Sequence, residues 1–138
     1  TSSEYDKHGL AIIGLMNEWN KDGKKIKGTD KNLGGTMRLG SYDAKLIKNT
    51  KIHKIYGKNL IKERHRHRYE VNIAFKEKFE KNGMIFSGLS PDGKLPEIIE
   101  LKNHPWFIGV QFHPEFKSRP FASHPLFSSF IKASKNHK

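Results

Sequence analysis

The chain has 138 residues, a length that fits one domain with a hydrophobic core of its own. Its 26 lysines and arginines outnumber 14 acidic residues, and the net charge of +12 suits either a solvated lysine-rich surface or a polyanionic partner. The absence of cysteine excludes disulfides and thiolate metal sites. The longest apolar runs are far too short to cross a bilayer, so we expect no membrane segment and a cytoplasmic protein.

The first forty residues are expected to form two short strands separated by polar loops. The apolar run Leu10–Met16 predicts a buried strand, with Gly14 as its weak point. Residues 17–32 are rich in lysine and glycine and predict a turn-rich loop. A glycine-rich turn at 32–35 then leads into an alternating strand that ends at Gly40. No helix start and no Gly-Lys-Ser/Thr follows this turn, so we favour close backbone packing there over phosphate binding.

The middle of the chain alternates between charged and apolar residues. Residues 43–55 fit either a strand with a short helix or two short strands. The segment Lys51–Tyr56, followed by Gly57, predicts a helical turn with a glycine cap.

Residues 63–72 alternate strictly and predict a strand with an arginine face and a second face of His65, His67 and Tyr69. The arginine face (Arg64, Arg66 and Arg68) suits a small anionic substrate, RNA or a charged edge strand, and these alternatives stay open. The two histidines lack a close third ligand, so we expect no metal site.

The C-terminal half predicts a helix, a β-meander and a last helix. Asn72 can cap a helix over 72–82, whose core stripe is Val71, Phe75 and Phe79 and whose stop is Gly83. Strands are predicted at 84–89, 95–101 and 106–110, with a turn at 90–93. Pro125 can begin the last helix, and its apolar face consists of Leu126, Phe127, Phe130 and Ile131.

The meander ends beside a candidate catalytic pair, His113 and Glu115. Alternate residues of an extended chain point the same way, and Pro114 favours extended geometry at His113, so both side chains can share one face. A carboxylate beside an imidazole can fix its tautomer and stabilise the imidazolium. Such a pair can activate a nucleophile or a water molecule. No serine lies in a nucleophile elbow, so these residues supply a base and its orienting group without a nucleophile.

Five stretches together resemble a known family. They are LGGTMRLG at 33–40, ERHRHRYEVN at 63–72, EIIE at 97–100, NHPWFIGVQFHPEF at 103–116 and HPLF at 124–127. They resemble the C-terminal part of the class I glutamine amidotransferase domain of the CTP synthases, over nearly the whole chain. The resemblance implies an α/β fold: a partial flavodoxin-like domain with a mixed sheet, an antiparallel C-terminal meander and flanking helices.

The resemblance also implies an activity and its residues. In the family a cysteine thiolate attacks the side-chain amide of glutamine, so His113 would be the base and acid and Glu115 its orienting group. Glutamine would be held by Glu4, which would face its ammonium, and by Arg68, which would face its carboxylate. The released ammonia would serve the ATP-dependent amination of UTP to CTP, a ligase reaction of pyrimidine biosynthesis.

The resemblance leaves parts of the enzyme outside residues 1–138. We expect the chain to be the C-terminal portion of the amidotransferase domain, without the nucleophile half or the synthase domain that binds ATP and Mg. The isolated chain is therefore expected to be inactive and to need those parts as partners, in a homo-oligomer. A GTP effector would act near the loop 21–32, which carries Lys27 where arginine is usual. The alternative is a non-catalytic basic module that binds nucleotide or RNA through Arg64, Arg66, Arg68 and the loop 21–31.

Overall fold

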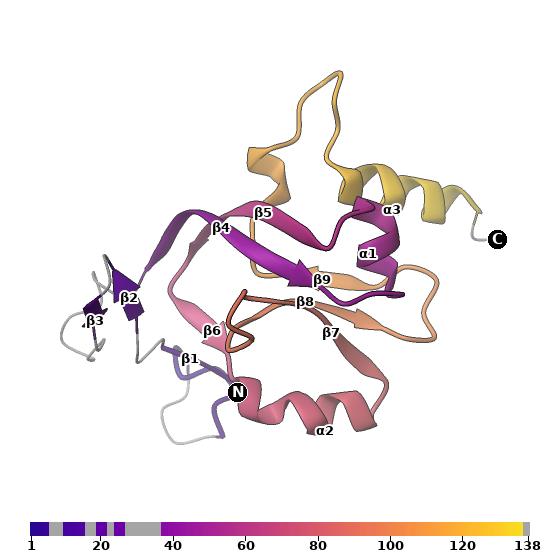
Figure 1. The fold of residues 1–138 in the computed structure, drawn as a ribbon. Helices are drawn as coiled ribbons and strands as arrows, with labels where there is room; N and C mark the ends of the chain where they lie inside the picture. Colours follow the sequence, from indigo (N-terminus) through magenta and orange to yellow (C-terminus); the bar gives the residue numbers. More distant parts are fainter. Residues whose placement is uncertain (6–9, 16–18, 22–23, 27–36, 137–138) are drawn as a thin grey trace.

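The computed structural model describes residues 1–5, 10–15, 19–21, 24–26 and 37–136 of the chain (Figure 1). The elements in chain order are β1 (Ile13–Leu15), β2 (Trp19–Lys21), β3 (Lys24–Ile26), β4 (Arg38–Leu46), α1 (Lys51–Tyr56), β5 (Leu60–His67), β6 (Tyr69–Val71), the 3₁₀ helix η2 (Ile73–Phe75), α2 (Lys76–Lys81), β7 (Met84–Leu89), β8 (Pro96–Leu101), β9 (Ile108–Val110), the 3₁₀ helix η3 (Pro114–Phe116) and α3 (Pro125–Asn136).

A five-stranded antiparallel sheet in the order β5-β4-β7-β8-β9 forms the body of the molecule. Its longest ladder joins β4 and β5, from the pair Arg38 and His67 to the pair Lys45 and Leu60. The expected C-terminal meander is confirmed as β7, β8 and β9. Beyond β9 the backbone N–H of His113 donates to the carbonyl oxygen of Arg64 in β5, at 2.8 Å. The edge strand β5 is therefore joined to the segment that follows the other edge strand, β9.

The N-terminal residues form shorter pairings beside this sheet. β1 pairs with β6, and β2 pairs with β3, both antiparallel. Ser2 and Ile13 form an isolated parallel bridge. The expectation of a buried strand over Leu10–Met16 was wrong in extent and burial. The strand begins at Ile13, and Leu10 is 67% exposed, because its three residues pair with β6 and not within the main sheet.

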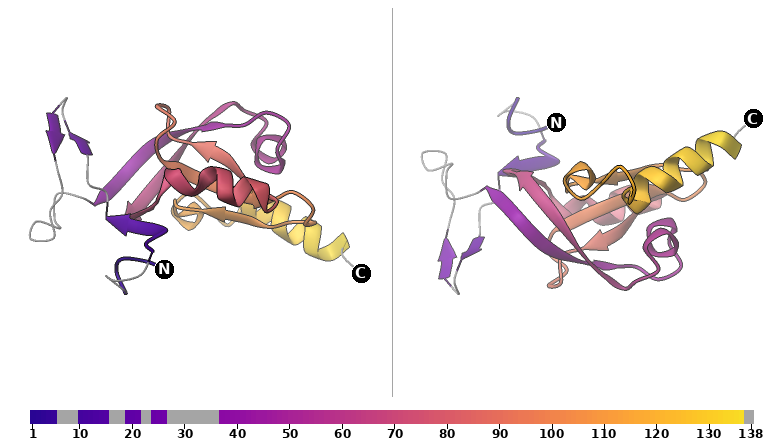
Figure 2. Two further views of the ribbon diagram at one scale, coloured as in Figure 1. Left: turned by 90° about the horizontal axis from the view of Figure 1, so that it is seen from below. Right: turned by 90° about the horizontal axis from the view of Figure 1, so that it is seen from above.

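The helices lie on two sides of the sheet (Figure 2). α2 covers the sheet when the molecule is seen from below, and α3 does so when it is seen from above. The predicted turn of helix at Lys51–Tyr56 is confirmed as α1, and Gly57 ends it with a left-handed φ of 63°. The carboxylate of Glu100 in β8 accepts the first N–H groups of α1, from Lys51 at 3.0 Å and Ile52 at 3.1 Å. A buried side chain of the sheet thus satisfies donors that a helix start leaves unpaired.

The apolar core lies between the sheet and the helices α1 and α3. Its buried members are Ala44, Leu46, Ile52, Ile61, Ile98, Phe112 and Leu126. It is a small core, and many buried side chains beside it are charged or polar: Arg38, Glu63, His65, Glu70, Glu97, Glu100 and His124. Much of the interior is therefore held by hydrogen bonds and ion pairs, each of which must be satisfied to avoid a desolvation penalty.

Two helix predictions needed correction. The helix expected over 72–82 begins as the 3₁₀ turn η2, although Asn72 does cap it by accepting the Ala74 N–H at 3.0 Å. No residue of α2 is fully buried, so the expected core stripe is only half-buried.

In α3 only Leu126 enters the core, and most of the expected apolar face stays exposed: Phe127 39%, Phe130 47% and Ile131 64%. Trp106 packs against Phe130, with ring centroids 5.0 Å apart, and His124 contacts Phe127, with ring centroids 5.9 Å apart.

The fold class is α/β with flanking helices, as expected. The expected sheet was mixed, whereas all pairings of the described five-stranded sheet are antiparallel. Among the described residues, no helix combines the length and the hydropathy that crossing a membrane would require.

Candidate active site

His113 and Glu115 lie together just after the last strand of the sheet. Nδ1 of His113 is 2.6 Å from Oε1 of Glu115, and both side chains are partly exposed. The contact predicted from sequence is present, and His113 has the extended backbone expected before Pro114 (φ −109°, ψ 90°), but Glu115 lies in a 3₁₀ turn and not in extended chain. β9 begins at Ile108, not Trp106, and ends at Val110, and the pair spans the 3₁₀ turn η3 with Pro114 in its first turn. A proline is favourable there, because its missing N–H would have no helical partner.

The short contact orients the imidazole. A carboxylate at Nδ1 makes that nitrogen the proton donor, which leaves Nε2 of His113 as the acceptor. The pKa of Glu115 lies below its ordinary value, because its own backbone N–H and then the hydrogen bond with His113 stabilise the carboxylate. The pair is therefore arranged as a base with an ionised orienting group.

The strand β5 holds this pair in place. The His113 N–H donates to the Arg64 carbonyl, as described above. Nζ of Lys117, just after η3, donates to the carbonyl oxygen of Lys62 at 2.6 Å and lies 3.3 Å from Oε1 of Glu63. Three consecutive residues of one strand thus support the turn that carries the dyad, on both sides of it.

The two proposed glutamine-binding residues lie on neighbouring segments. Arg68 occupies the break between β5 and β6, and its Nε is buried without a hydrogen-bond partner in the described part of the chain. Glu4 belongs to the segment 1–5, which is held to β1 by the bond from Ser3 N to Ile13 O at 2.9 Å. β1 in turn pairs with β6. Among the described residues, no hydrogen bond or ion pair joins Glu4 or Arg68 to the dyad.

The expected arginine face divides in the structure. Arg64 and Arg66 are exposed on β5, whereas Arg68 is only partly exposed because the strand breaks at it. The histidine face enters the interior: His65 is 1% exposed. Burial, followed by the charge of Arg38, lowers the pKa of His65 to about 3, so this imidazole is neutral. No group of three metal-ligating side chains occurs among the described residues, which include His65 and His67.

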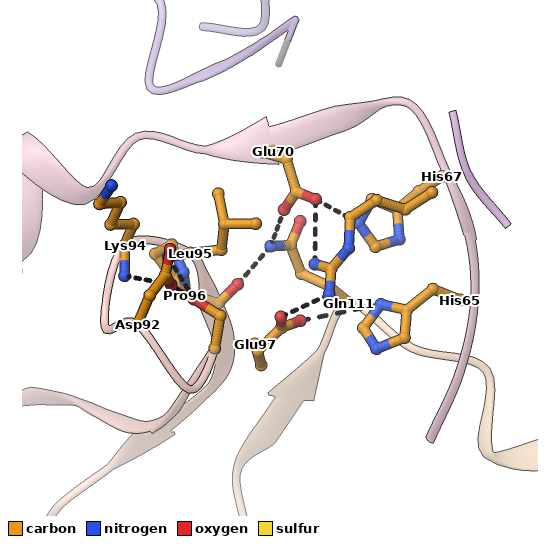
Figure 3. Close-up of polar contacts among 11 residues, drawn as sticks. His65, His67, Glu70, Asp92, Lys94, Leu95, Pro96, Glu97 and Gln111 are labelled. Carbon is orange, nitrogen blue, oxygen red and sulfur yellow. Dashed lines mark hydrogen bonds and ion pairs between the residues drawn. The ribbon is translucent and has the colours of Figure 1, made fainter. Parts of the chain in front are cut away.

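Sequence reasoning missed a buried ion cluster centred on Arg38 (Figure 3). Its Nη1 lies 3.1 Å from Oε1 of Glu70, and its Nη2 lies 2.8 Å from Oε1 of Glu97. The guanidinium also stacks over the ring of Tyr42, 4.5 Å from its centroid. The sequence did carry a signal for this burial. Alternate residues of a strand face the same side, so Arg38 shares a face of its strand with Ala44 and Leu46, which belong to the core.

The two carboxylates of the cluster respond differently to burial. Burial raises the pKa of Glu70, but hydrogen bonds and charges from His67 and Arg38 outweigh it and leave the pKa below its ordinary value. At Glu97 burial raises the pKa by more than the hydrogen bond and the charge of Arg38 lower it. The charge of Glu70 raises it further, so the net shift is upward. The lowered pKa favours the ionised form of Glu70, and the raised pKa makes Glu97 the more readily protonated of the two carboxylates.

Another buried carboxylate, Glu63, joins the C-terminal helix to the sheet. Its Oε1 accepts from the Tyr56 hydroxyl at 3.1 Å and lies 3.2 Å from Nε2 of His124. Nδ1 of His124 accepts the N–H of Leu126 at 3.3 Å, which makes Nε2 the protonated nitrogen. Burial and then the charge of Glu63 raise the pKa of Tyr56 well above its ordinary value, so the hydroxyl remains a donor.

Two sequence predictions fall largely outside the described residues. The glycine-rich turn at 32–35 is one of them. The other is the loop 21–32 with Lys27, of which only the residues of the β2–β3 pairing are described.

Comparison with known proteins decides the family. The family model described as "Glutamine amidotransferase class-I" matches residues 9–133, which is most of the chain. The chain belongs to the class I glutamine amidotransferases. This confirms the amidotransferase fold expected from the sequence.

Curated relatives show which amidotransferases this chain is similar to. It is 86% identical to the CTP synthase of Pelagibacter ubique over the whole chain and 26% of that protein. It is 60% identical to the CTP synthase of Rhodospirillum centenum, over 96% of this chain and 25% of that protein. The chain thus spans about a quarter of the length of these curated relatives.

A solved structure of the same kind is similar to nearly all of the chain. The glutaminase domain of Trypanosoma brucei CTPS with bound acivicin superposes with a TM-score of 0.79 and 33% identity, over 99% of this chain and 51% of that one. The resemblance to the CTP synthases that the sequence suggested is confirmed.

Proposed function

We propose that the chain is the C-terminal part of the glutaminase unit of a CTP synthase, which hydrolyses glutamine and supplies ammonia for the amination of UTP. The observation that carries the proposal is the 2.6 Å contact between His113 and Glu115 in a chain of this family. The identity of 86% to a CTP synthase supports the choice among amidotransferases.

In this proposal each member of the dyad has one task. Nε2 of His113, left free of the carboxylate, takes the proton of a cysteine thiol that then attacks the amide carbon of glutamine. The same nitrogen returns the proton to the departing amine, which leaves as ammonia, and a water molecule then hydrolyses the thioester to glutamate. Glu115 stabilises the imidazolium between these steps. Residues 1–138 contain no cysteine, so the nucleophile in this proposal comes from outside them.

Glutamine recognition is assigned to Glu4 and Arg68. A carboxylate suits the ammonium group of the substrate, and a guanidinium grips its carboxylate with two parallel hydrogen bonds. The buried Nε of Arg68 has no hydrogen-bond partner among the described residues, and this supports the assignment, because a buried donor without a partner is costly until a ligand satisfies it.

The rest of the proposed enzyme would lie in further polypeptide. A nucleophile-bearing segment and a synthase domain with ATP and Mg would complete it, as a homo-oligomer in the cytoplasm with GTP as effector. The chain's length, about a quarter of its CTP synthase relatives, leaves room for these parts.

Glutamate release from glutamine by the complete enzyme tests the proposal. We expect His113→Ala to lower kcat/KM about 10²- to 10⁴-fold, the contribution of a positioned general base, while CTP formation from added ammonia persists. His104→Ala, an exposed histidine at the other end of β9, is the matched control and should retain activity. Normal glutamate release by the His113→Ala enzyme would overturn the assignment.

The isolated chain should release no glutamate above background, since it has no cysteine. Turnover by purified residues 1–138 that His113→Ala abolishes would mean that the mechanism needs no thiolate.

A further inference from the structure

We propose that Glu70 is a positioning residue that holds the glutamine-binding Arg68 and the dyad in fixed relation to one another. The inference rests on the proposed function for the roles of Arg68 and His113. It assigns to the buried cluster a task beyond stabilising the fold.

Glu70 is a node with three donors (Figure 3). Its Oε1 accepts from Arg38 and also from Nε2 of His67, at 2.8 Å, and its Oε2 accepts from Nε2 of Gln111 at 2.6 Å. Glu70 is 5% exposed. A buried carboxylate with three donors is held in one orientation, and each donor is fixed by it in return.

The node lies between the two halves of the proposed site. Glu70 follows Arg68 by two residues along one segment, and Gln111 precedes His113 by two along another. Two residues of extended chain span about 6–7 Å. The contact from Glu70 to Gln111 is thus a side-chain bridge between the segment that would hold substrate and the segment that holds the base.

The rest of the bridge is also fixed. The Gln111 side-chain amide donates to the carbonyl oxygen of Pro96 as well, and the Gln111 backbone N–H donates to the carbonyl of Glu97 at 3.0 Å. Arg38 binds Glu97 with its second nitrogen. The strands β4, β6 and β8 and the segment after β9 therefore meet at one place.

The charge of Glu70 is what the bridge requires. All three of its partners present N–H groups, and a carboxylate can accept from all of them at once. In Glu70→Gln an amide group of nearly the same shape would place its own N–H groups against one of these donors. The hydrogen bond from Gln111 or the one from His67 is then lost, while the packing around the side chain at position 70 is kept.

Glu97 provides the matched control. It is as deeply buried as Glu70 and binds the same guanidinium, but its side chain makes no hydrogen bond to Gln111. If the cluster only stabilised the fold, Glu97→Gln and Glu70→Gln would have similar effects. If Glu70 positions the site, only Glu70→Gln changes glutamine kinetics.

The experiment measures glutamate release at varied glutamine in the complete enzyme, with His113→Ala alongside. We expect Glu70→Gln to raise KM for glutamine by about 10-fold and to lower kcat by a smaller factor, since a small misplacement of a binding group costs this much. Gln111→Leu, which removes the other end of the bridge, should give the same pattern. The double variant should be no worse than the more affected single one, because both remove one contact.

The outcomes are distinguishable. Unchanged KM in Glu70→Gln, or equal shifts in Glu70→Gln and Glu97→Gln, overturns the positioning role while the loss of activity in His113→Ala leaves the proposed function standing. Full activity of His113→Ala overturns the proposed function itself, and the positioning role with it. If Glu70→Gln fails to fold, Gln111→Leu at its half-buried position decides: a wild-type KM refutes the role, and a raised KM supports it.

Discussion

Replacing Arg38 by methionine tests whether the buried cluster is held by charge. Arg38 is 3% exposed, and each of its two terminal nitrogens binds a carboxylate that is itself buried. Arg38→Met keeps an unbranched side chain but leaves Glu70 and Glu97 without the guanidinium that both of them bind. Removing one partner of a buried pair costs about 3–5 kcal/mol, against a typical total stability of about 5–15 kcal/mol.

The cost should depend on pH with a defined sign. In the native protein the pKa of Glu70 is below its ordinary 4.5, so the stability it contributes is complete above pH 4.5 and is lost as pH falls through the folded value. The raised pKa of Glu97 acts in the opposite direction, and its contribution is lost as pH rises above 4.5 through the folded value. Without Arg38 the carboxylate of Glu97 loses the hydrogen bond and the charge that oppose its burial, so its pKa rises further, whereas Glu70 keeps its hydrogen bond with His67. The deficit of Arg38→Met should therefore grow as pH rises.

Urea unfolding followed by circular dichroism at pH 5 and pH 8 measures this effect. A loss of about 4 kcal/mol corresponds to a midpoint shift of about 2 M, for a slope of about 2 kcal/mol/M. Arg66→Met, the same replacement at an exposed arginine of β5, should change stability by less than about 0.5 kcal/mol. A deficit below about 1 kcal/mol in Arg38→Met, equal at both pH values, would refute the reasoning.

Three further substitutions have defined costs in the same assay. Gly88→Ala places a Cβ 2.7 Å from Cδ1 of Ile98 and should destabilise by about 1–3 kcal/mol, and Ile98→Val should recover part of this loss. Glu100→Gln removes one of two acceptors at the start of α1 and should cost about 1–3 kcal/mol. Asn72→Ala removes the cap on the Ala74 N–H and should cost about 0.5–2 kcal/mol, whereas no change would show that the cap is not needed.

The sequence was most informative where structure is local. The turn at Ser90 is set by its own side chains, since Ser90 Oγ donates to Asp92 Oδ1 at 2.6 Å and accepts the Leu95 N–H at 2.9 Å. The meander and the cap at Asn72 follow from such short-range chemistry. The dyad was found for the same reason, because its two members are adjacent in one turn.

Features that depend on distant partners could not be derived in this way. The alternation of β5 predicted that His65 and Arg64 lie on opposite faces but did not say which face is buried. Glu70 and Glu97 are charged residues, which composition alone assigns to the surface. Their burial depends on Arg38, which lies far from them in the sequence. The exposed face of α3 has the same origin, since periodicity shows that Phe127 and Ile131 share a face but not whether anything covers it.

The bond between His113 and Arg64 gives the dyad a special place in the order of assembly. The bond joins β5, one edge of the sheet, to the segment that follows β9, the other edge. Residues so distant along the chain meet only after the loop between them has closed. The meander and the β4–β5 hairpin can each form beforehand from nearby residues. We therefore expect the geometry of the proposed dyad to form late and to be lost early when the edges part, so that activity of the complete enzyme fails at milder denaturant than secondary structure does.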